Sequence, residues 1–314
     1  RIDPRIMEYI TFRNRDRLVR TPAHAVALDC LAAGIEAALP ERLLADAVSV
    51  DDRTGTVRIE DVAGAVGEYA LRDYDRVFLV GAGKAAAETA AALGDALADG
   101  RATDGGPAVD AGVVVTDEPV ESSNSAMPAP VETLPGDHPL PSERGVENTR
   151  RLLDLAEGAA PDDLLLTVVT GGGSALLAAP ADPLSVADLR TVTAELLACG
   201  ASIAEINAVR KHCSAVKGGR LARAAAPAAV VTLAISDVIG DPLDTIGSGP
   251  TVPDSSTYAD ALAVLDRYDL DVPGAVREHL RAGAVGDREE TPVAGDLAFD
   301  RADGIFGYDL GRLE

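Results

Sequence analysis

The sequence is poor in aromatic residues, and this shortage, with two other absences, limits what the protein can be. Its 314 residues contain no tryptophan and only 3% aromatic side chains, although 47% are hydrophobic. A chain of this size and apolar content can still bury one large core or two ordinary ones. No apolar run reaches the ~18 residues that a membrane-spanning helix needs, and no basic segment followed by an apolar one opens the chain. We therefore expect a soluble, cytoplasmic protein.

Cysteine and histidine are also scarce. The three cysteines, Cys30, Cys199 and Cys213, form no Cys-x-x-Cys pair, which favours reduced thiols over a disulfide framework or a zinc site. His24, His212 and His279 lack metal-ligand spacing. There is no Gly-x-Ser-x-Gly elbow, so a serine hydrolase is disfavoured.

Positive charge is in short supply as well. The chain has 51 acidic against 28 basic residues, for a net charge of −23. Such a charge repels nucleic acid and anionic membranes, so we expect neither as a partner. An acidic chain with few lysines is typical of proteins from very salty environments, where salt screens the self-repulsion. We therefore hypothesise a halophilic source.

Lysine is the rarest basic residue in the chain. Only Lys84, Lys211 and Lys217 are present, and each lies beside a glycine-rich stretch. A compact ammonium meets a phosphate as a point charge, whereas the guanidinium fork of arginine fits differently. The three lysines are therefore candidates for phosphate contacts, although an arginine-biased gene would also leave few lysines by chance.

Strand and helix patterns alternate along most of the chain, which predicts an α/β, Rossmann-like domain with a mostly parallel sheet and helices on both faces. Residues 1–20 read as an irregular N-terminal extension, 21–285 as the domain, and 286–314 as a linker or frayed end. Expected strands cover residues 47–50, 56–59, 76–80, 111–119, 163–169 and 228–235. Expected helices cover residues 21–39, 84–100, 142–156, 185–198, 204–223, 258–268 and 273–282.

Three glycine-rich turns follow three of the expected strands. They are Gly81-Ala82-Gly83-Lys84, then Thr170-Gly171-Gly172-Gly173-Ser174, and the stretch from Ser236 that ends in Gly247-Ser248-Gly249. Ligands of open α/β sheets bind beyond the carboxyl ends of the strands, and glycine-rich turns let backbone N–H groups surround an anion. The three turns together predict a phosphorylated ligand.

The first turn fits neither common nucleotide motif. Gly81-x-Gly83-x-x-Ala86 matches a loose dinucleotide fingerprint, which expects an acidic residue about 20 residues later at the end of the next strand. The next expected strand ends only at Asp117, which is late, and no Gly-x4-Gly-Lys-[Ser/Thr] sequence is present.

A basic segment covers residues 206–222. On a helix, Arg210, Ser214 and Lys217 would share one face, with Asn207 one turn earlier. A face of this kind suits a multiply charged anion, although a solvated basic face that pairs with the acidic surface would look the same.

Two further segments contain candidate catalytic groups. Asp237 directly follows the strand that ends near residue 235, where a carboxylate can hold Mg²⁺ beside a nucleotide or accept a proton, but it could equally cap a turn. Asp241 and Asp244 fit turn positions better. His138, between Asp137 and Pro139, could polarise a substrate or make a structural hydrogen bond.

Five motifs occur in a fixed order: VGAGKAA, GDHPLP, TGGGSALL, NAVRKHCSAVKGGRLA and ISDVIGDPLDTIGSGPTVPD. Together they resemble the glycerate 2-kinases of the family named for its MOFRL domain, whose members have often been labelled hydroxypyruvate reductases. The resemblance covers about residues 13–290. It implies a Rossmann-like N-terminal domain and a smaller C-terminal domain with the active site between them. The family usually continues beyond the point where this chain stops, so we expect a shortened member.

The resemblance also implies an activity: transfer of the ATP γ-phosphate to the 2-hydroxyl of D-glycerate, with Mg²⁺, giving 2-phosphoglycerate. Catalytic roles fall to Lys84, Asp237 and Arg210, and Asp237 is also the candidate metal ligand. The substrate- and phosphate-binding residues implied are Gly81, Gly83, Gly171, Gly172, Gly173, Ser174, Asn207, Lys211, Lys217 and Ser248.

Two alternative functions remain open at this stage. One is an NAD(P)-dependent hydroxypyruvate reductase, and the other is a non-catalytic fragment that binds a nucleotide. The sequence also leaves a homodimer open.

Overall fold

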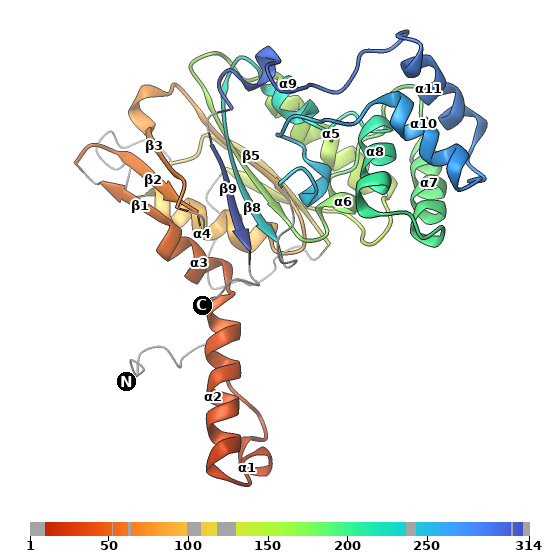
Figure 1. Cartoon of the computed structure of the whole chain (residues 1–314). Coiled ribbons are helices and arrows are strands. Elements are labelled where there is room, and N and C mark those ends of the chain that lie inside the picture. The colour runs from red at the N-terminus through yellow and green to blue at the C-terminus, as the bar shows by residue number, and fades with distance from the viewer. Residues whose placement is uncertain are drawn as a thin grey trace.

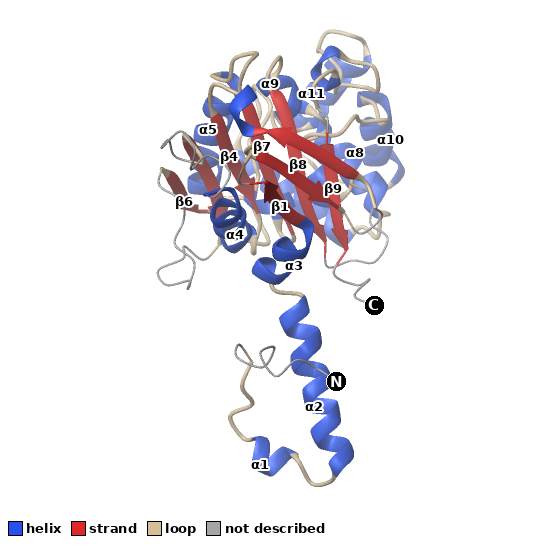
Figure 2. Ribbon diagram, turned by 90° about the vertical axis from the view of Figure 1, so that its left-hand side faces the viewer, coloured by secondary structure: helices blue, strands red, loops and turns tan. Residues whose placement is uncertain are grey.

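The fold is an α/β domain built on a six-stranded parallel sheet, as the sequence predicts (Figures 1 and 2). The structure is a computed structural model that describes residues 10–51, 53–61, 64–98, 108–117, 130–236, 243–302 and 304–309. In the described residues, no single helix is long and apolar enough to cross a membrane, and one pair bent by 65°, Pro22–Ala37 with Pro40–Ala47, passes that test by length and composition alone.

The main sheet has the strand order of a doubly wound nucleotide-binding fold. Its strands run in the order β6-β5-β4-β7-β8-β9, every neighbouring pair is parallel, and chain order therefore reads 3-2-1-4-5-6 across the sheet. The strands are β4 (Val77–Ala82), β5 (Ala111–Thr116), β6 (Val131–Pro135), β7 (Leu164–Thr170), β8 (Ala229–Ser236) and β9 (Gly304–Asp309). The chain leaves β4 toward one edge and returns through β7 to build the other, so a topological switch point lies between these two strands.

Helices cover both faces of this sheet. Not every helix of the described residues lies on the sheet, and together they are α1 (Arg15–Leu18), α2 (Pro22–Ala37), α3 (Pro40–Ala47), α4 (Ala86–Ala98), α5 (Glu143–Glu157), α6 (Gly173–Leu176), α7 (Val186–Ala198), α8 (Ile203–His212), α9 (Arg220–Ala225), α10 (Tyr258–Arg267) and α11 (Gly274–Ala284). A small antiparallel sheet adds β1 (Val48–Asp51), β2 (Thr56–Glu60) and β3 (Val66–Ala70).

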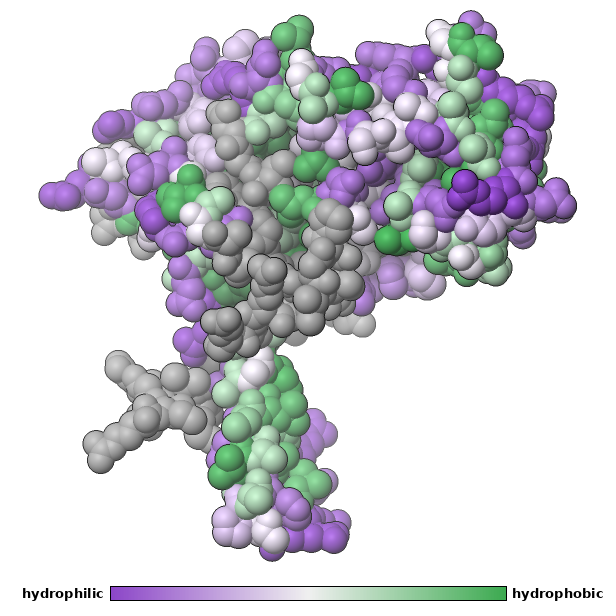
Figure 3. Space-filling view, in the orientation of Figure 1, coloured by the Kyte–Doolittle hydropathy of each residue, from purple (hydrophilic) through white to green (hydrophobic). Residues whose placement is uncertain are grey.

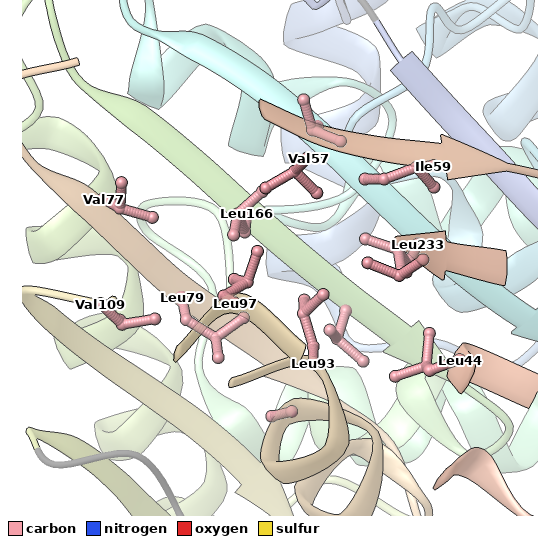
Figure 4. Packing of buried hydrophobic residues seen from close by; sticks show 14 of the residues in the cluster. Leu44, Val57, Ile59, Val77, Leu79, Leu93, Leu97, Val109, Leu166 and Leu233 are labelled. Atoms are coloured by element: carbon pink, nitrogen blue, oxygen red, sulfur yellow. The ribbon is translucent and has the colours of Figure 1, made fainter. Parts of the chain in front are cut away.

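The strands of the main sheet send alternate side chains to two separate cores. Val77 and Leu79 of β4 face a core formed with α3, α4 and the small sheet, while Phe78 and Val80 face one formed with α5, α6 and α9. Figure 4 shows the first core, where Val57 of the small sheet lies over Leu166 of β7. β4 and β7 are buried along their whole length, as their mostly apolar sequences predict for the central strands of a parallel sheet.

Helices α7, α8, α10 and α11 form a separate lobe beside the carboxyl ends of the strands (Figure 1). Helix α2 extends away from the rest of the molecule (Figure 1), and the space-filling view shows apolar side chains along it (Figure 3). Val26, Leu31 and Ile35 of this helix are exposed by 60%, 52% and 41%.

The segment after Gly286 differs from the linker or frayed end that its loss of periodicity predicts. Residues 288–302 pack on the domain: Asp254 donates its backbone N–H to the carbonyl oxygen of Pro292, and Glu290 accepts from the backbone N–H of Tyr258. The chain then enters β9, at the edge of the sheet beside β8. Contacts made by individual side chains, which periodicity does not register, hold this segment in place.

Candidate functional site

The first two glycine-rich turns meet at the switch point. Because β4 and β7 are parallel neighbours, the turns that follow them leave the same edge of the sheet. The backbone N–H of Lys84 donates to the carbonyl oxygen of Gly171 at 2.8 Å, and that of Ala85 donates to Oγ1 of Thr170 at 3.2 Å. The fold therefore brings together Gly81, Gly83 and Lys84 with residues 171–174, which are about 90 positions later in the chain.

Glycine is required at two positions of these turns. Gly83 has φ +142°, and a Cβ there would lie 2.1 Å from Oγ1 of Thr170. Gly172 has φ +86°, and a Cβ there would lie 3.0 Å from Cγ of Lys84 and 3.3 Å from Cδ2 of His138. The side chains of Lys84 and His138 therefore converge over the bare backbone of Gly172. Both are exposed, so a ligand can reach the ammonium of Lys84.

The third turn packs against the end of β7. A Cβ on Gly247 would lie 2.7 Å from Cγ1 of Val169. Its carbonyl oxygen accepts from Nζ of Lys217 at 3.1 Å, and Oγ of Ser248 donates to Oδ1 of Asn207 at 3.0 Å. Ser248 is fully buried with φ 63°, a left-handed conformation that is rare for serine and that often marks a functional site.

The basic segment is not the single helix that the sequence predicts, and that expectation is wrong. α8 ends at His212, a turn covers residues 213–219, and α9 begins at Arg220. Gly218 and Gly219 take φ +57° and +78°, and Oγ of Ser214 accepts the backbone N–H groups of residues 216 and 217, so this hydroxyl competes with helix formation.

Arg210, Ser214 and Lys217 nevertheless come together, though not on one helical face. With Ser174 they line one small cavity between the turn after β7 and the lobe. Burial lowers the pKa of Lys217 to about 7, with a further contribution from the charge of Arg210, and burial also lowers the pKa of Arg210. Within the described residues, neither side chain has an acidic partner at ion-pair distance. This arrangement suits an incoming anion.

The other predicted residues are distributed as follows. Lys211 is 4% exposed, and its Nζ donates to Oδ1 of Asp254 at 3.0 Å, so its charge is already paired. Asp237 and Asp241 lie outside the described residues. Asp244 lies 3.9 Å from Nζ of Lys211.

Sequence reasoning passed over Asp254 as a candidate. It lies in the motif TVPDSS and is 2% exposed. It accepts from Ser256 through both backbone N–H and Oγ. A serine two residues after an aspartate is a signal for such a turn, but the lysine partner 43 residues away carries no local signal.

The described residues contain no group of three or more His, Cys, Asp or Glu placed to hold a metal ion. A lone carboxylate can still serve Mg²⁺, because that ion keeps several waters and is commonly shared with substrate phosphates.

Comparison with known sequences gives a family and named relatives. The family described as "Domain of unknown function (DUF4147)" matches residues 26–281. The chain is 43% identical over 204 residues to the D-glycerate 2-kinase of Thermotoga maritima, covering 65% of this chain and 46% of that protein. It is 36% identical over 268 residues to the glycerate 2-kinase of Pyrococcus horikoshii, covering 85% and 56%. A protein of Agrobacterium vitis, provisionally named a hydroxypyruvate reductase, is 44% identical over 229 residues, covering 72% and 48%.

Solved structures agree with these relatives. The crystal structure of the glycerate kinase of Thermotoga maritima matches with a TM-score of 0.68 and 33% identity, covering 91% of this chain and 58% of that one. A protein of Pyrococcus horikoshii matches with a TM-score of 0.72 and 35% identity, covering 88% and 58%. The chain spans about half the length of the curated relatives it matches.

Proposed function

The chain belongs to the DUF4147 family, and we propose that it is the nucleotide-binding part of a D-glycerate 2-kinase, which transfers the ATP γ-phosphate to the 2-hydroxyl of D-glycerate. The observation that carries the proposal is the meeting of Lys84 with the turn of Gly171–Ser174 at the switch point. Beside it, Arg210 and Lys217 line a small cavity, and neither has an acidic partner among the described residues. Two glycine turns and three cations match a ligand with several phosphate charges plus a carboxylate.

The proposed mechanism is positioning and charge neutralisation. Lys84 reaches the transferring phosphate as a point charge, while the backbone around Gly172 and Gly173 approaches it closely. Arg210 and Lys217 add positive charge behind Ser174, around a cavity of about 20 Å³ that has room for little more than one water molecule. Asn207 and Ser248 fix the turn whose Gly247 oxygen orients Lys217.

ATP and Mg²⁺ are the proposed cofactors. Asp237, which directly follows β8, is the residue that would bind Mg²⁺ or accept the proton of the substrate hydroxyl, and both roles stay open for it. Bound Mg²⁺ would neutralise charge on the ATP phosphates. The described residues add no further metal ligand to this proposal.

The proposal is tested by replacing Lys84. Turnover is measured as ADP release with D-glycerate and ATP–Mg²⁺, and we expect Lys84→Met to lower it by about two orders of magnitude or more. Lys84→Arg keeps the charge but changes its shape, so it should restore little. Arg281→Met, which removes an exposed charge elsewhere, is the matched control. Near-normal turnover of Lys84→Met would overturn the assignment.

A second experiment covers the case in which this chain binds its ligands without turning them over. If this chain shows no turnover, calorimetry with ATP–Mg²⁺ and D-glycerate separates a binding fragment from an unrelated domain. Nucleotide binding that is lost in Lys84→Met supports a nucleotide-binding fragment of the kinase, whereas unchanged binding in that variant contradicts the proposed site.

A nicotinamide-dependent hydroxypyruvate reductase is the second candidate, and one observation favours it. Asp117 directly follows β5, the strand beside β4, which is where dinucleotide-binding folds hold the ribose. The same position would also suit the ribose of ATP. Oxidation of NAD(P)H in the presence of hydroxypyruvate, followed by absorbance, would establish the reductase and exclude the kinase as the main activity.

We also make proposals about the source of the protein, its partners, its location and its assembly. The net charge of −23 supports a halophilic source and argues against nucleic acid or an anionic membrane as a partner. We also propose a cytoplasmic location and a homodimer, for which the exposed apolar residues of α2 are a candidate interface. Light scattering of the wild type and of Leu31→Glu would test the dimer, since a monomer in both excludes it.

A further inference from the structure

A second pocket lies outside the proposed active site. Its volume is about 490 Å³, within the range of small-molecule sites. It is formed by the turn after α8, by α9, by α10 and α11, and by residues 287–289, and it shares only Ser214 with the cavity of Lys217. Three arginines line it: Arg220, Arg223 and Arg288.

Arg220 is half-buried, and the nearby carboxylates that act on its charge, Glu290 and Asp254, lie beyond ion-pair distance. Its guanidinium donates to the backbone oxygen of Lys211 at 3.1 Å and to the hydroxyl of Tyr258 at 3.3 Å, both neutral acceptors. None of the ion pairs formed by the described residues includes Arg220, and burial lowers its pKa. By contrast, Arg223 is paired with Glu289 and Asp296. A half-buried guanidinium with unused donors is therefore available to an anion.

Two other polar atoms of residues that line the pocket have no hydrogen-bond partner in the part of the chain that the structure describes. They are Nε of Arg288 and Nδ1 of His279, both buried. Nε2 of His279 lies 2.8 Å from the backbone oxygen of residue 212. Because that oxygen can only accept, the ring proton belongs on Nε2 and Nδ1 is a vacant acceptor. Burial lowers the pKa of His279, which keeps the ring neutral. Unsatisfied buried groups of this kind are rare in folded proteins.

The acidic residues of the pocket stand at its rim. Glu157, Asp182, Asp287 and Glu289 line it but are all exposed to solvent. Their charges are screened by salt, whereas those of half-buried arginines are screened much less. The interior of the pocket therefore offers positive charge from the guanidinium groups of Arg220 and Arg288.

We propose that this pocket binds a small phosphomonoester as a regulatory ligand, distinct from the substrates of the proposed kinase. Arg220 and Arg288 bind the phosphate oxygens, and the ester group occupies the rest of the pocket. The pocket adjoins the segment that carries the active-site cations, because Arg220 is bonded to the backbone of Lys211 and Ser214 orients the backbone N–H of Lys217. Occupancy of the pocket therefore stabilises the position of Lys217.

The test measures binding of glycerol 3-phosphate and, separately, of inorganic phosphate by calorimetry at one fixed ionic strength. It uses the wild type, Arg220→Met, Arg288→Gln and Lys84→Met. We expect Arg220→Met and Arg288→Gln each to weaken glycerol 3-phosphate about tenfold or more, since each removes a charge-assisted hydrogen bond. Lys84→Met should leave that affinity unchanged. Weaker binding of inorganic phosphate identifies the hydroxyl-bearing ester as the ligand.

The opposite pattern would overturn the proposal. If glycerol 3-phosphate binding is lost in Lys84→Met but retained in Arg220→Met and Arg288→Gln, the ligand binds only at the switch point. If the wild type does not bind glycerol 3-phosphate, the proposed function of the pocket is also refuted. Circular dichroism shows whether each variant is folded. If Arg220→Met is unfolded, the binding affinity of Arg288→Gln tests the proposal by itself, since Arg288 makes its hydrogen bond to the backbone oxygen of Asp182. None of these results depends on kinase turnover.

Discussion

Removing the ammonium of Lys211 should destabilise the fold far more than removing a surface charge. Lys211 and Asp254 are 4% and 2% exposed, and the distance between Nζ and Oδ1 is 3.0 Å. Burial by itself would raise the pKa of Asp254, but hydrogen bonds from Ser256 and the charge of Lys211 outweigh it, so the pKa is lowered. Lys211→Met would leave a carboxylate buried beside a thioether.

The expected magnitude follows from that uncompensated charge. Removing one partner of a buried ion pair costs about 3–5 kcal/mol, against a total stability of about 5–15 kcal/mol for a typical domain. The midpoint of thermal unfolding should fall by roughly 10 °C. The second variant, Lys211→Met with Asp254→Asn, removes the charge itself and should recover a large part of the loss.

The assay is unfolding by denaturant followed by circular dichroism at constant high salt. Arg267→Met is the matched control, because Arg267 pairs with Glu205 but its side chain is 67% exposed. Exposed pairs contribute about 0–1 kcal/mol, so this variant should remain close to the wild type.

Two results would refute this reasoning. One is a loss in Lys211→Met as small as that in the Arg267 control, and the other is a double variant no more stable than Lys211→Met. The pH dependence gives an independent check. Because the folded pKa of Asp254 is lowered, its contribution is present above the ordinary aspartate pKa of about 4 and is lost as the pH falls through the lowered value. That acid loss should shrink in Lys211→Met.

Three further predictions concern a second lysine, two glycines and salt. The folded pKa of Lys217 is about 7, below its unfolded value of about 10.4. The free energy of unfolding should therefore rise as the pH is raised from about 7 to about 10.4. The same rise in Lys217→Met would contradict this. Gly83→Ala, whose Cβ would lie 2.1 Å from Oγ1 of Thr170, should destabilise the fold by several kcal/mol, whereas Gly34→Ala, in an open position of α2, should stabilise it by about 0.5–1 kcal/mol; equal melting temperatures would contradict both. The wild type should unfold in dilute buffer and refold as salt is added, because its charge of −23 is then screened; full stability at low salt, measured by circular dichroism, would disprove the halophilic hypothesis.

Much of the fold could be predicted because its signals are local. β4 and β7 are mostly apolar runs, and the pattern around Ser142 marks the start of α5 with a capping serine. The glycine turns were visible for the same reason. β6 and β9 were missed because both are edge strands, whose short sequences carry little hydrophobic periodicity.

The basic segment shows where local reasoning fails. A helical repeat places Arg210, Ser214 and Lys217 on one face, yet α8 ends at His212. The turn is set by Gly218 and Gly219, whose left-handed conformations are fixed by hydrogen bonds to residues 248 and 249, about 30 positions away. Residues so distant in sequence leave no mark on the pattern around residue 214.

The sequence by itself determined the alternation of strands and helices, the three glycine turns and the scarcity of lysine, since each is a property of short stretches or of composition. Only the tertiary structure decided where those features lie relative to one another and which of them are buried. It placed the turns after β4 and β7 side by side at the switch point, it buried Lys211 against Asp254 while leaving Lys84 exposed, and it gathered Arg220, His279 and Arg288 around a second pocket. Strand order and burial are set by long-range packing, which is why three lysines alike in sequence context have three different environments.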